Sequence, residues 1–312
     1  MGGIEMSQKH ETWGWMLAVD FFFAGMGAAM LLFAGIAELL TGSNLSTVGI
    51  LAGAVFIAMG AGLLVLELGR PFQALRVFMN PKAILTFGAW NMSIAIVAGL
   101  FLGTSWLEAF PWFGLVGFRK ILAIVCIFTG FVVAAYPGAL LARHKARPFW
   151  NGPGMMVLFL TSSLLTGFAA YVVCGWISEA APVVYSAFPA LAAGLCAFQL
   201  VLWIGYLWIK SSGTTDRELA AVKRWTSGNF ANPFRVGFMF LGTVVPLVLF
   251  LIPNEFSTGV AGILAILGGA IMRNLVVYAG QDRTWLPGEE KYRSRLPHGD
   301  EAFLQKVWTK QI

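Results

Sequence analysis

Residues 13–40 read WGWMLAVDFFFAGMGAAMLLFAGIAELL, a long and almost uninterrupted apolar run. The run is long enough to cross a bilayer as a helix, because about 20 apolar residues at ~1.5 Å each cover the hydrocarbon core. Trp13 and Trp15 stand at its start, where indole rings favour the membrane interface. Asp20 interrupts the run roughly 10 Å below the membrane surface. A carboxylate at that depth is costly, so Asp20 is a candidate functional residue.

The composition of the whole chain is that of a polytopic membrane protein. Of the 312 residues, 58% are hydrophobic and 12% are charged, and the mean hydropathy is +0.76. Pro137 and Pro246 predict local kinks in two of the later segments. The sequence predicts an all-α bundle of eight transmembrane spans with both termini on the same side, the later spans lying at residues 48–66, 84–104, 121–141, 154–176, 184–209, 234–252 and 259–279.

We expect one membrane domain, at residues 13–280, and no separate soluble domain. Residues 1–12 form an N-terminal extramembrane segment in this interpretation. They do not resemble a signal peptide, because Glu5 precedes any basic residue and the apolar run behind them is too long. Residues 281–312 carry prolines, mixed charges and aromatic residues, which predicts an extramembrane C-terminal arm.

The net charge of +6 is concentrated on one face of the predicted bundle. Lysine and arginine gather in the loops after the second, fourth and sixth spans and in the tail, all of which lie on the same side as the termini. The positive-inside rule would put this basic face in the cytoplasm. The same charge would also suit a face that docks a soluble partner, and the charge count does not separate the two causes.

Cysteine and histidine usage argues against a metal centre within the protein. The three cysteines are each alone in an apolar stretch and form no CxxC motif, so neither an iron–sulfur cluster nor a zinc site is encoded. The histidines, His10, His144 and His298, lie outside the predicted spans. A haem held between helices needs axial ligands inside the bundle, so a haem anchor is not expected.

Further ionisable groups fall near the basic face. Arg273 interrupts the eighth span at about the depth of Asp20, roughly 10 Å below the same surface. We expect the two to share a site, as a pair or through a ligand or water; the alternative is a structural ion pair that holds the first and last spans together. Tyr136 lies about one turn before the end of the fourth span, while Glu67 and Arg70 follow the second and form either part of the site or a pair at the interface.

Several motifs, in the right order, resemble the family of NrfD-type membrane subunits, to which the C chain of polysulfide reductase belongs. The likeness runs from about residue 13 to residue 281. It rests on LGRP at 68–71, MNP at 79–81, GAW at 88–90, YPGALLARHKARPFWNGPGMMVLFLTSSLLTGFA at 136–169 and LGGAIMRNLVVYAGQ at 267–281.

The resemblance implies an integral subunit of a respiratory oxidoreductase in the bacterial or archaeal cytoplasmic membrane, not catalytic on its own. Such subunits bind menaquinone or ubiquinone and contain no haem or iron–sulfur cluster. They pair with a ferredoxin-like four-cluster iron–sulfur subunit and usually a molybdopterin catalytic subunit. In polysulfide reductase-like members the docking face is extracytoplasmic, which conflicts with the positive-inside rule.

The resemblance also implies roles for individual residues. In polysulfide reductase-like members an Asn and a His on the first span and a Tyr on the fourth hold the quinone. Leu17 stands at the Asn position, Asp20 at the His position, and Tyr136 is the best match for the Tyr. A carboxylate can replace an imidazole as proton carrier, but Leu17 cannot replace an amide as hydrogen-bond partner. We expect Asp20 to carry protons, Tyr136 to bond a quinone carbonyl and Arg273 to tune Asp20, with further quinone contacts from Trp13, Glu67 and Arg70.

Two other functions fit the same residues. A secondary transporter or ion pathway could use Asp20 and Arg273, and it would predict uptake by the isolated protein and helices broken in mid-membrane. A passive anchor would only dock a partner, and its activity would survive replacement of both residues.

Overall fold

The computed structural model describes residues 14–43, 46–67, 77–79, 83–144, 147, 149–177, 188–213, 216–252 and 254–279. This part of the protein has no strand and contains eight segments long and apolar enough to cross a membrane, which confirms the predicted helical bundle. The spans are α1 (Trp15–Thr41), α2 (Thr47–Glu67), α3 (Ile84–Thr104), α4 (Val116–Ala142), α5 (Gly154–Ile177), α6 (Phe188–Ser211), η3 (Pro233–Val244) continued by α8 (Val245–Phe250), and α9 (Glu255–Ala279).

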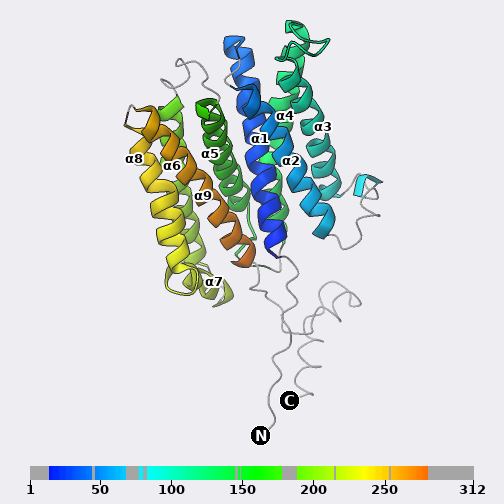
Figure 1. Ribbon diagram of the computed structural model, residues 1–312. Helices are drawn as coiled ribbons and strands as arrows, with labels where there is room; N and C mark the ends of the chain where they lie inside the picture. The colour runs from blue at the N-terminus through cyan, green and yellow to red at the C-terminus, as the bar shows by residue number, and fades with distance from the viewer. Residues whose placement is uncertain are drawn as a thin grey trace.

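Helix α1 lies at the centre of the bundle, with α2, α3 and α4 on one side and α5, α6, α8 and α9 on the other (Figure 1). It packs directly against α2, α4, α5 and α9. Its small buried residues, among them Gly25, Gly27, Ala28 and Ala29, let these neighbours approach closely. The first span is therefore the element on which both halves of the bundle assemble.

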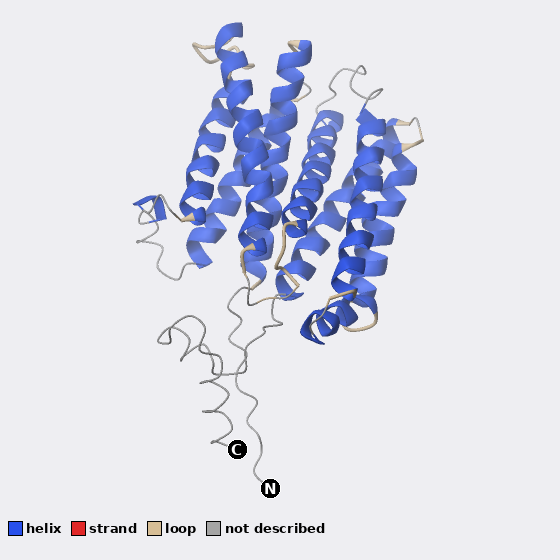
Figure 2. Ribbon diagram, turned by 180° about the vertical axis from the view of Figure 1, so that it is seen from behind, coloured by secondary structure: helices blue, strands red, loops and turns tan. Residues whose placement is uncertain are grey.

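The described part of α1 begins, and that of α9 ends, at the same end of the bundle (Figure 1). We call this the basic end, because exposed Arg143, Lys223, Arg224 and Arg235 belong to segments that meet there. The other end, where α1 finishes at Thr41, is called the opposite end. Figure 2 shows the same arrangement from behind.

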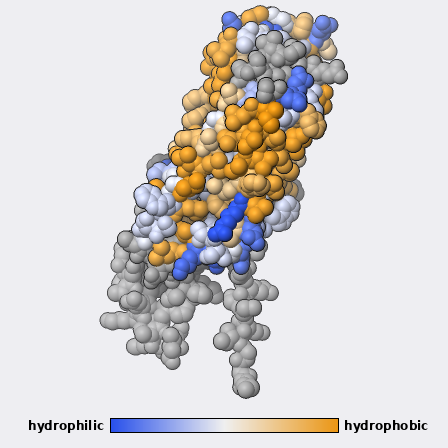
Figure 3. Space-filling view, turned by 90° about the vertical axis from the view of Figure 1, so that its left-hand side faces the viewer, coloured by the Kyte–Doolittle hydropathy of each residue, from blue (hydrophilic) through white to orange (hydrophobic). Residues whose placement is uncertain are grey.

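The surface between the two ends is apolar, as expected for contact with lipid. A broad hydrophobic band covers the face formed by the later helices, and hydrophilic residues gather at both of its ends (Figure 3). Large side chains such as Val201 and Ile204 of α6 are 67% and 60% exposed on this surface. In water such exposure would be unfavourable, whereas hydrocarbon accepts it without cost. The protein is a multi-pass integral membrane protein.

Two elements differ from the sequence prediction. Helix α4 begins at Val116 rather than near residue 121, so Arg119 lies inside the helix instead of in a loop. An additional helix, α7 (Asp216–Thr226), occupies the predicted loop after the sixth span. It is amphipathic: Val222 and Trp225 are buried, while Lys223 and Arg224 are exposed, which suits a helix lying along the basic end.

The seventh span changes helix type at the predicted kink. The N–H of Val245 bonds the carbonyl of Phe240, five residues back, which is the π-helical pattern. This widened stretch precedes Pro246, which has no N–H to donate and disfavours regular α-helix before it. The side chain of Thr243 also donates to Phe238 O, 3.0 Å away, and accepts from Gln199 of α6 at 3.1 Å.

Candidate functional site

Asp20 lies in the second turn of α1 and is buried, with 2% of its surface exposed. Its side chain faces α2 at Gly60. A Cβ added at Gly60 would lie 2.9 Å from Asp20 Oδ1 and 3.0 Å from the Ala24 Cβ, so the missing side chain of glycine gives the carboxylate room there. The buried acid predicted from the first span is therefore held between α1 and α2.

Tyr136 lies on α4 and its ring packs against Gly88 of α3. A Cβ at Gly88 would come within 2.5 Å of Tyr136 Cε2 and 2.6 Å of Cζ, so the ring occupies the space that any larger residue would need. The ring is buried, with 6% exposed. Within the described part of the protein, the Tyr136 hydroxyl has no hydrogen-bond partner. A buried hydroxyl without a partner is an unsatisfied hydrogen-bond donor, which a bound acceptor would satisfy.

Asp20 and Tyr136 lie at a similar depth on two helices, α1 and α4, that pack directly against each other. The charge of Asp20 is close enough to act on the Tyr136 phenol. Asp20 lies five residues from the start of α1 and Tyr136 six from the end of α4, which puts both roughly 8–9 Å inside the basic end. The first four helices thus bring an acid and a phenol together at one depth.

Arg273 is completely buried on α9, but its hydrogen bonds go to α5. Its Nη1 donates to Ser162 Oγ at 2.5 Å and its Nη2 to Ser163 Oγ at 2.8 Å, with a longer contact of 3.5 Å to Phe159 O. The guanidinium also stands 5.3 Å from the centre of the Phe159 ring. The hydroxyls, rather than Asp20, receive these N–H groups, so the direct ion pair considered from the sequence is not formed.

Asp20 and Arg273 do not pair because they approach α1 from different directions around its axis. A Cβ at Gly25 would lie 3.4 Å from Arg273 Nη2, whereas Asp20 meets Gly60 on α2. Gly25 follows Asp20 by five residues, a rotation of roughly 140° around the helix axis. The two groups therefore reach α1 from different sides despite their similar depth.

The structure adds three polar residues that the sequence interpretation missed. Ser162 and Ser163 hold Arg273, and Ser163 also donates to Ala134 O on α4 at 3.3 Å. Asn91 is buried on α3 one turn from Gly88 and donates to Phe87 O at 2.8 Å. Polar residues inside otherwise apolar spans were the available clue, since such residues usually face the bundle interior.

A second buried charged cluster lies at the opposite end. Arg119 Nε donates to Glu38 Oε1 at 3.1 Å, and the guanidinium stands 4.0 Å from the centre of the Trp106 ring. Glu38 and Arg119 are 2% and 8% exposed. Glu38 is therefore the buried partner of Arg119 within α4.

The other predicted site residues lie partly outside the described residues. Leu17 is buried one turn before Asp20 and offers no hydrogen bond. Glu67 is the last residue of α2, but its side chain lies outside the described residues, as do Arg70 and Trp13 entirely. Within the described residues, no group of three or more His, Cys, Asp or Glu side chains could hold a metal ion.

The loop between α4 and α5 closes the basic end beside the site. Trp150 Nε1 donates to Val276 O of α9 at 2.7 Å, which ties this loop to the last helix. His144 packs against Trp150, and its burial, together with the charge of Arg147, lowers the pKa of His144 below the ordinary 6.5.

The protein is similar over most of its length to known proteins. Residues 3–284 match the family described as "Polysulphide reductase, NrfD". The C chain of polysulfide reductase from Wolinella succinogenes is 28% identical over 303 residues, covering 86% of this protein and 94% of the relative. Protein NrfD of Escherichia coli K12 is 25% identical over 312 residues, covering 86% and 95%. With the match spanning nearly its whole length and all eight spans, the protein belongs to the NrfD family of polysulphide reductase-type membrane proteins.

Proposed function

We propose that this protein is the quinone-reactive membrane subunit of a multi-subunit respiratory oxidoreductase. One relative is named as the C chain of a reductase, a name that itself implies further subunits. In this proposal electrons pass between a partner's iron–sulfur cluster and menaquinone or ubiquinone at the basic end. Protons enter and leave the quinone through side chains of the membrane subunit.

The unsatisfied hydroxyl of Tyr136 is the observation that carries the proposal. It is buried, it has no acceptor among the described residues, and its ring is fixed against Gly88. A quinone carbonyl is an acceptor that would complete this hydroxyl. Because the ring is already held in place, little ordering would be needed to form the bond.

Asp20 is the proton carrier in this proposal. Reduction of a quinone takes up two electrons and two protons, and a carboxyl near the acceptor can supply or receive a proton. The buried position of Asp20 beside Tyr136 supports this role. Arg273 makes no direct contact with Asp20 in this proposal. Its charge acts on Asp20 from the other side of α1, because charges interact more strongly in a low-dielectric interior than in water.

The basic end is where we expect the partners to bind. Exposed Arg143, Lys223, Arg224 and Arg235 suit an acidic protein surface, and such complementarity steers association and fixes orientation. The expected partners are a ferredoxin-like four-cluster iron–sulfur subunit and, beyond it, a molybdopterin catalytic subunit. Docking here would bring the nearest cluster to the end of the bundle that holds Asp20 and Tyr136.

Replacement of Asp20 by asparagine tests the proposal. Asp20→Asn keeps the size and polarity of the side chain but removes its titratable proton. Quinol-linked turnover of the assembled complex should therefore fall about 100-fold or more. Copurification of the partners should stay unchanged. The matched control is Glu108→Gln, which alters an exposed acid at the opposite end. Full quinol-linked activity in Asp20→Asn would refute the proton role.

The same variants separate the alternatives. Unaltered activity after replacement of both Asp20 and Arg273 would favour a passive anchor. Uptake of a solute or ion by the isolated protein would favour a transporter. The described spans do not favour the transporter, since none is broken in mid-membrane and the seventh passes from η3 into α8 without a gap.

A further inference from the structure

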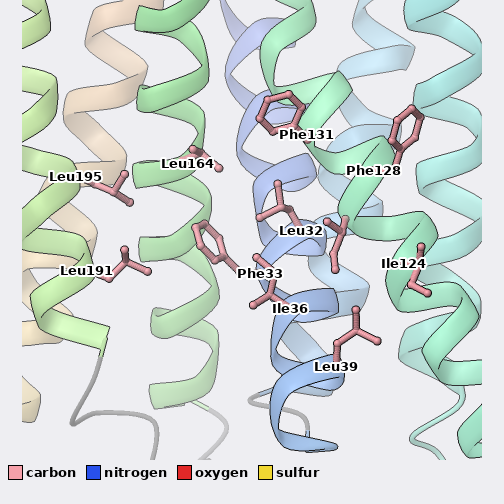
Figure 4. Close-up of a pocket in the computed structure, with 11 residues that line it drawn as sticks. Leu32, Phe33, Ile36, Leu39, Ile124, Phe128, Phe131, Leu164, Leu191 and Leu195 are labelled. Atoms are coloured by element: carbon pink, nitrogen blue, oxygen red, sulfur yellow. The ribbon is translucent and has the colours of Figure 1, made fainter.

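A groove opens on the lipid-facing side of the bundle, toward the opposite end (Figure 4). Its floor is formed by four apolar residues of α1, and α4 forms one wall with Ile124, Phe128 and Phe131; the floor residues are Leu32, Phe33, Ile36 and Leu39. The other wall comes from α5 and α6. The volume is about 670 Å³, and every side chain lining it is leucine, isoleucine or phenylalanine.

The groove follows from the way α4 and α5 pack. Near the basic end the two helices touch at Gly138, where an added Cβ would lie 2.7 Å from Met155 O. Farther along, Phe131 of α4 and Leu164 of α5 stand on opposite sides of an open space (Figure 4). The separation of the two helices leaves α1 exposed as the floor between them.

One exposed cation lies directly beyond the groove on the same face of α4. Lys120 precedes Ile124 by four residues and Phe131 by eleven, spacings that put all three side chains on one side of a helix. Its neighbour Arg119 is turned inward to Glu38 and Trp106. Lys120 is therefore the cation of α4 that is available at the mouth of the groove.

The dimensions match one leaflet of a bilayer. The eleven residues from Phe131 to Lys120 span roughly 16 Å along α4. Half of a hydrocarbon core of about 30 Å is about 15 Å. When Phe131 lies near the bilayer midplane, Lys120 reaches the level of the lipid headgroups.

We propose that this groove binds an anionic phospholipid of the leaflet at the opposite end. The phosphate lies at Lys120, and one acyl tail runs along α1 between α4 and α6. The lining offers no polar side chain, so the head of a quinone would find no hydrogen-bond partner within it. A zwitterionic lipid would gain less from Lys120 than a lipid with net negative charge.

The test measures lipids retained by the full-length protein in its native assembly. The protein is reconstituted in equimolar phosphatidylglycerol and phosphatidylcholine and purified in mild detergent, and the retained lipids are quantified by mass spectrometry. The wild type should be enriched in phosphatidylglycerol. Lys120→Gln should lower this enrichment about fivefold, whereas Lys120→Arg should preserve it.

A second pair of variants tests the groove itself. Leu195→Trp fills the wall formed by α6 and should reduce the total lipid retained. Val201→Trp, on the exposed surface of the same helix and outside the groove lining, should not. Equal retention of both lipids by the wild type, unchanged enrichment in Lys120→Gln, or an isoprenoid quinone as the retained molecule would each overturn the proposal.

Discussion

Replacing Gly88 by alanine should displace the Tyr136 ring and lower quinol turnover while the bundle still folds. The added Cβ would lie 2.5 Å from Tyr136 Cε2, whereas carbon atoms in contact ordinarily stay about 3.5 Å apart. The ring must therefore move by roughly 1 Å. Overpacking of this kind costs about 1–3 kcal/mol of stability. A misplacement of about 1 Å at a reacting centre can cost about 100-fold in rate.

The assay is quinol-linked turnover of the assembled complex, together with the thermal midpoint of the purified protein. Gly62→Ala is the matched control: Gly62 lies on α2, and an added Cβ there would meet nothing within 4 Å. That control should keep full activity and gain slightly in stability, because alanine favours the helix by about 0.5–1 kcal/mol.

A double variant separates the hydroxyl from general packing. If Gly88→Ala acts by moving the Tyr136 hydroxyl, it should cause little further loss of turnover in a Tyr136→Phe background. Equal losses in both backgrounds would mean that the damage comes from packing elsewhere. Wild-type activity in Gly88→Ala would contradict the role assigned to the phenol.

Two further predictions concern the buried charges. Replacing Ser162 and Ser163 together by alanine removes the hydroxyls that accept hydrogen bonds from Arg273, and should destabilise the protein by about 2–4 kcal/mol in thermal unfolding. Adding Arg273→Met should recover part of the loss, because no buried charge is then left unpaired. No recovery would mean that the serines act only through helix packing. Glu38→Leu leaves Arg119 buried beside an apolar side chain and should lower the stability of the protein by about 3 kcal/mol. Adding Arg119→Leu should restore most of the lost stability. An unchanged thermal midpoint in Glu38→Leu would show that the ion pair contributes nothing.

The spans could be predicted because each transmembrane helix satisfies its own backbone hydrogen bonds. Length and apolar content within one segment are then sufficient. The start of α4 was harder to predict, since charged Arg119 suggested a loop. Its place in the helix depends on Glu38, which is 81 positions away in the sequence. Helix α7 was missed because its apolar face is short and lies within a polar stretch.

The candidate site, like the fold, could be predicted from the sequence only in part. The depth of Asp20, Tyr136 and Arg273 followed from counting residues along each span. Depth gives a position along the helix axis but no direction around it. Arg273 consequently seemed a partner for Asp20, although it bonds the serines of α5.

The order of residues along this protein was enough to establish a bundle of eight transmembrane helices with a carboxylate inside the first of them. Those properties depend on the transfer of single segments from water to hydrocarbon. Only the folded bundle shows which side of α1 each buried group faces. It also shows that Gly60 makes room for Asp20 and Gly88 for Tyr136. These choices depend on the close packing of several helices at once, which no single segment encodes.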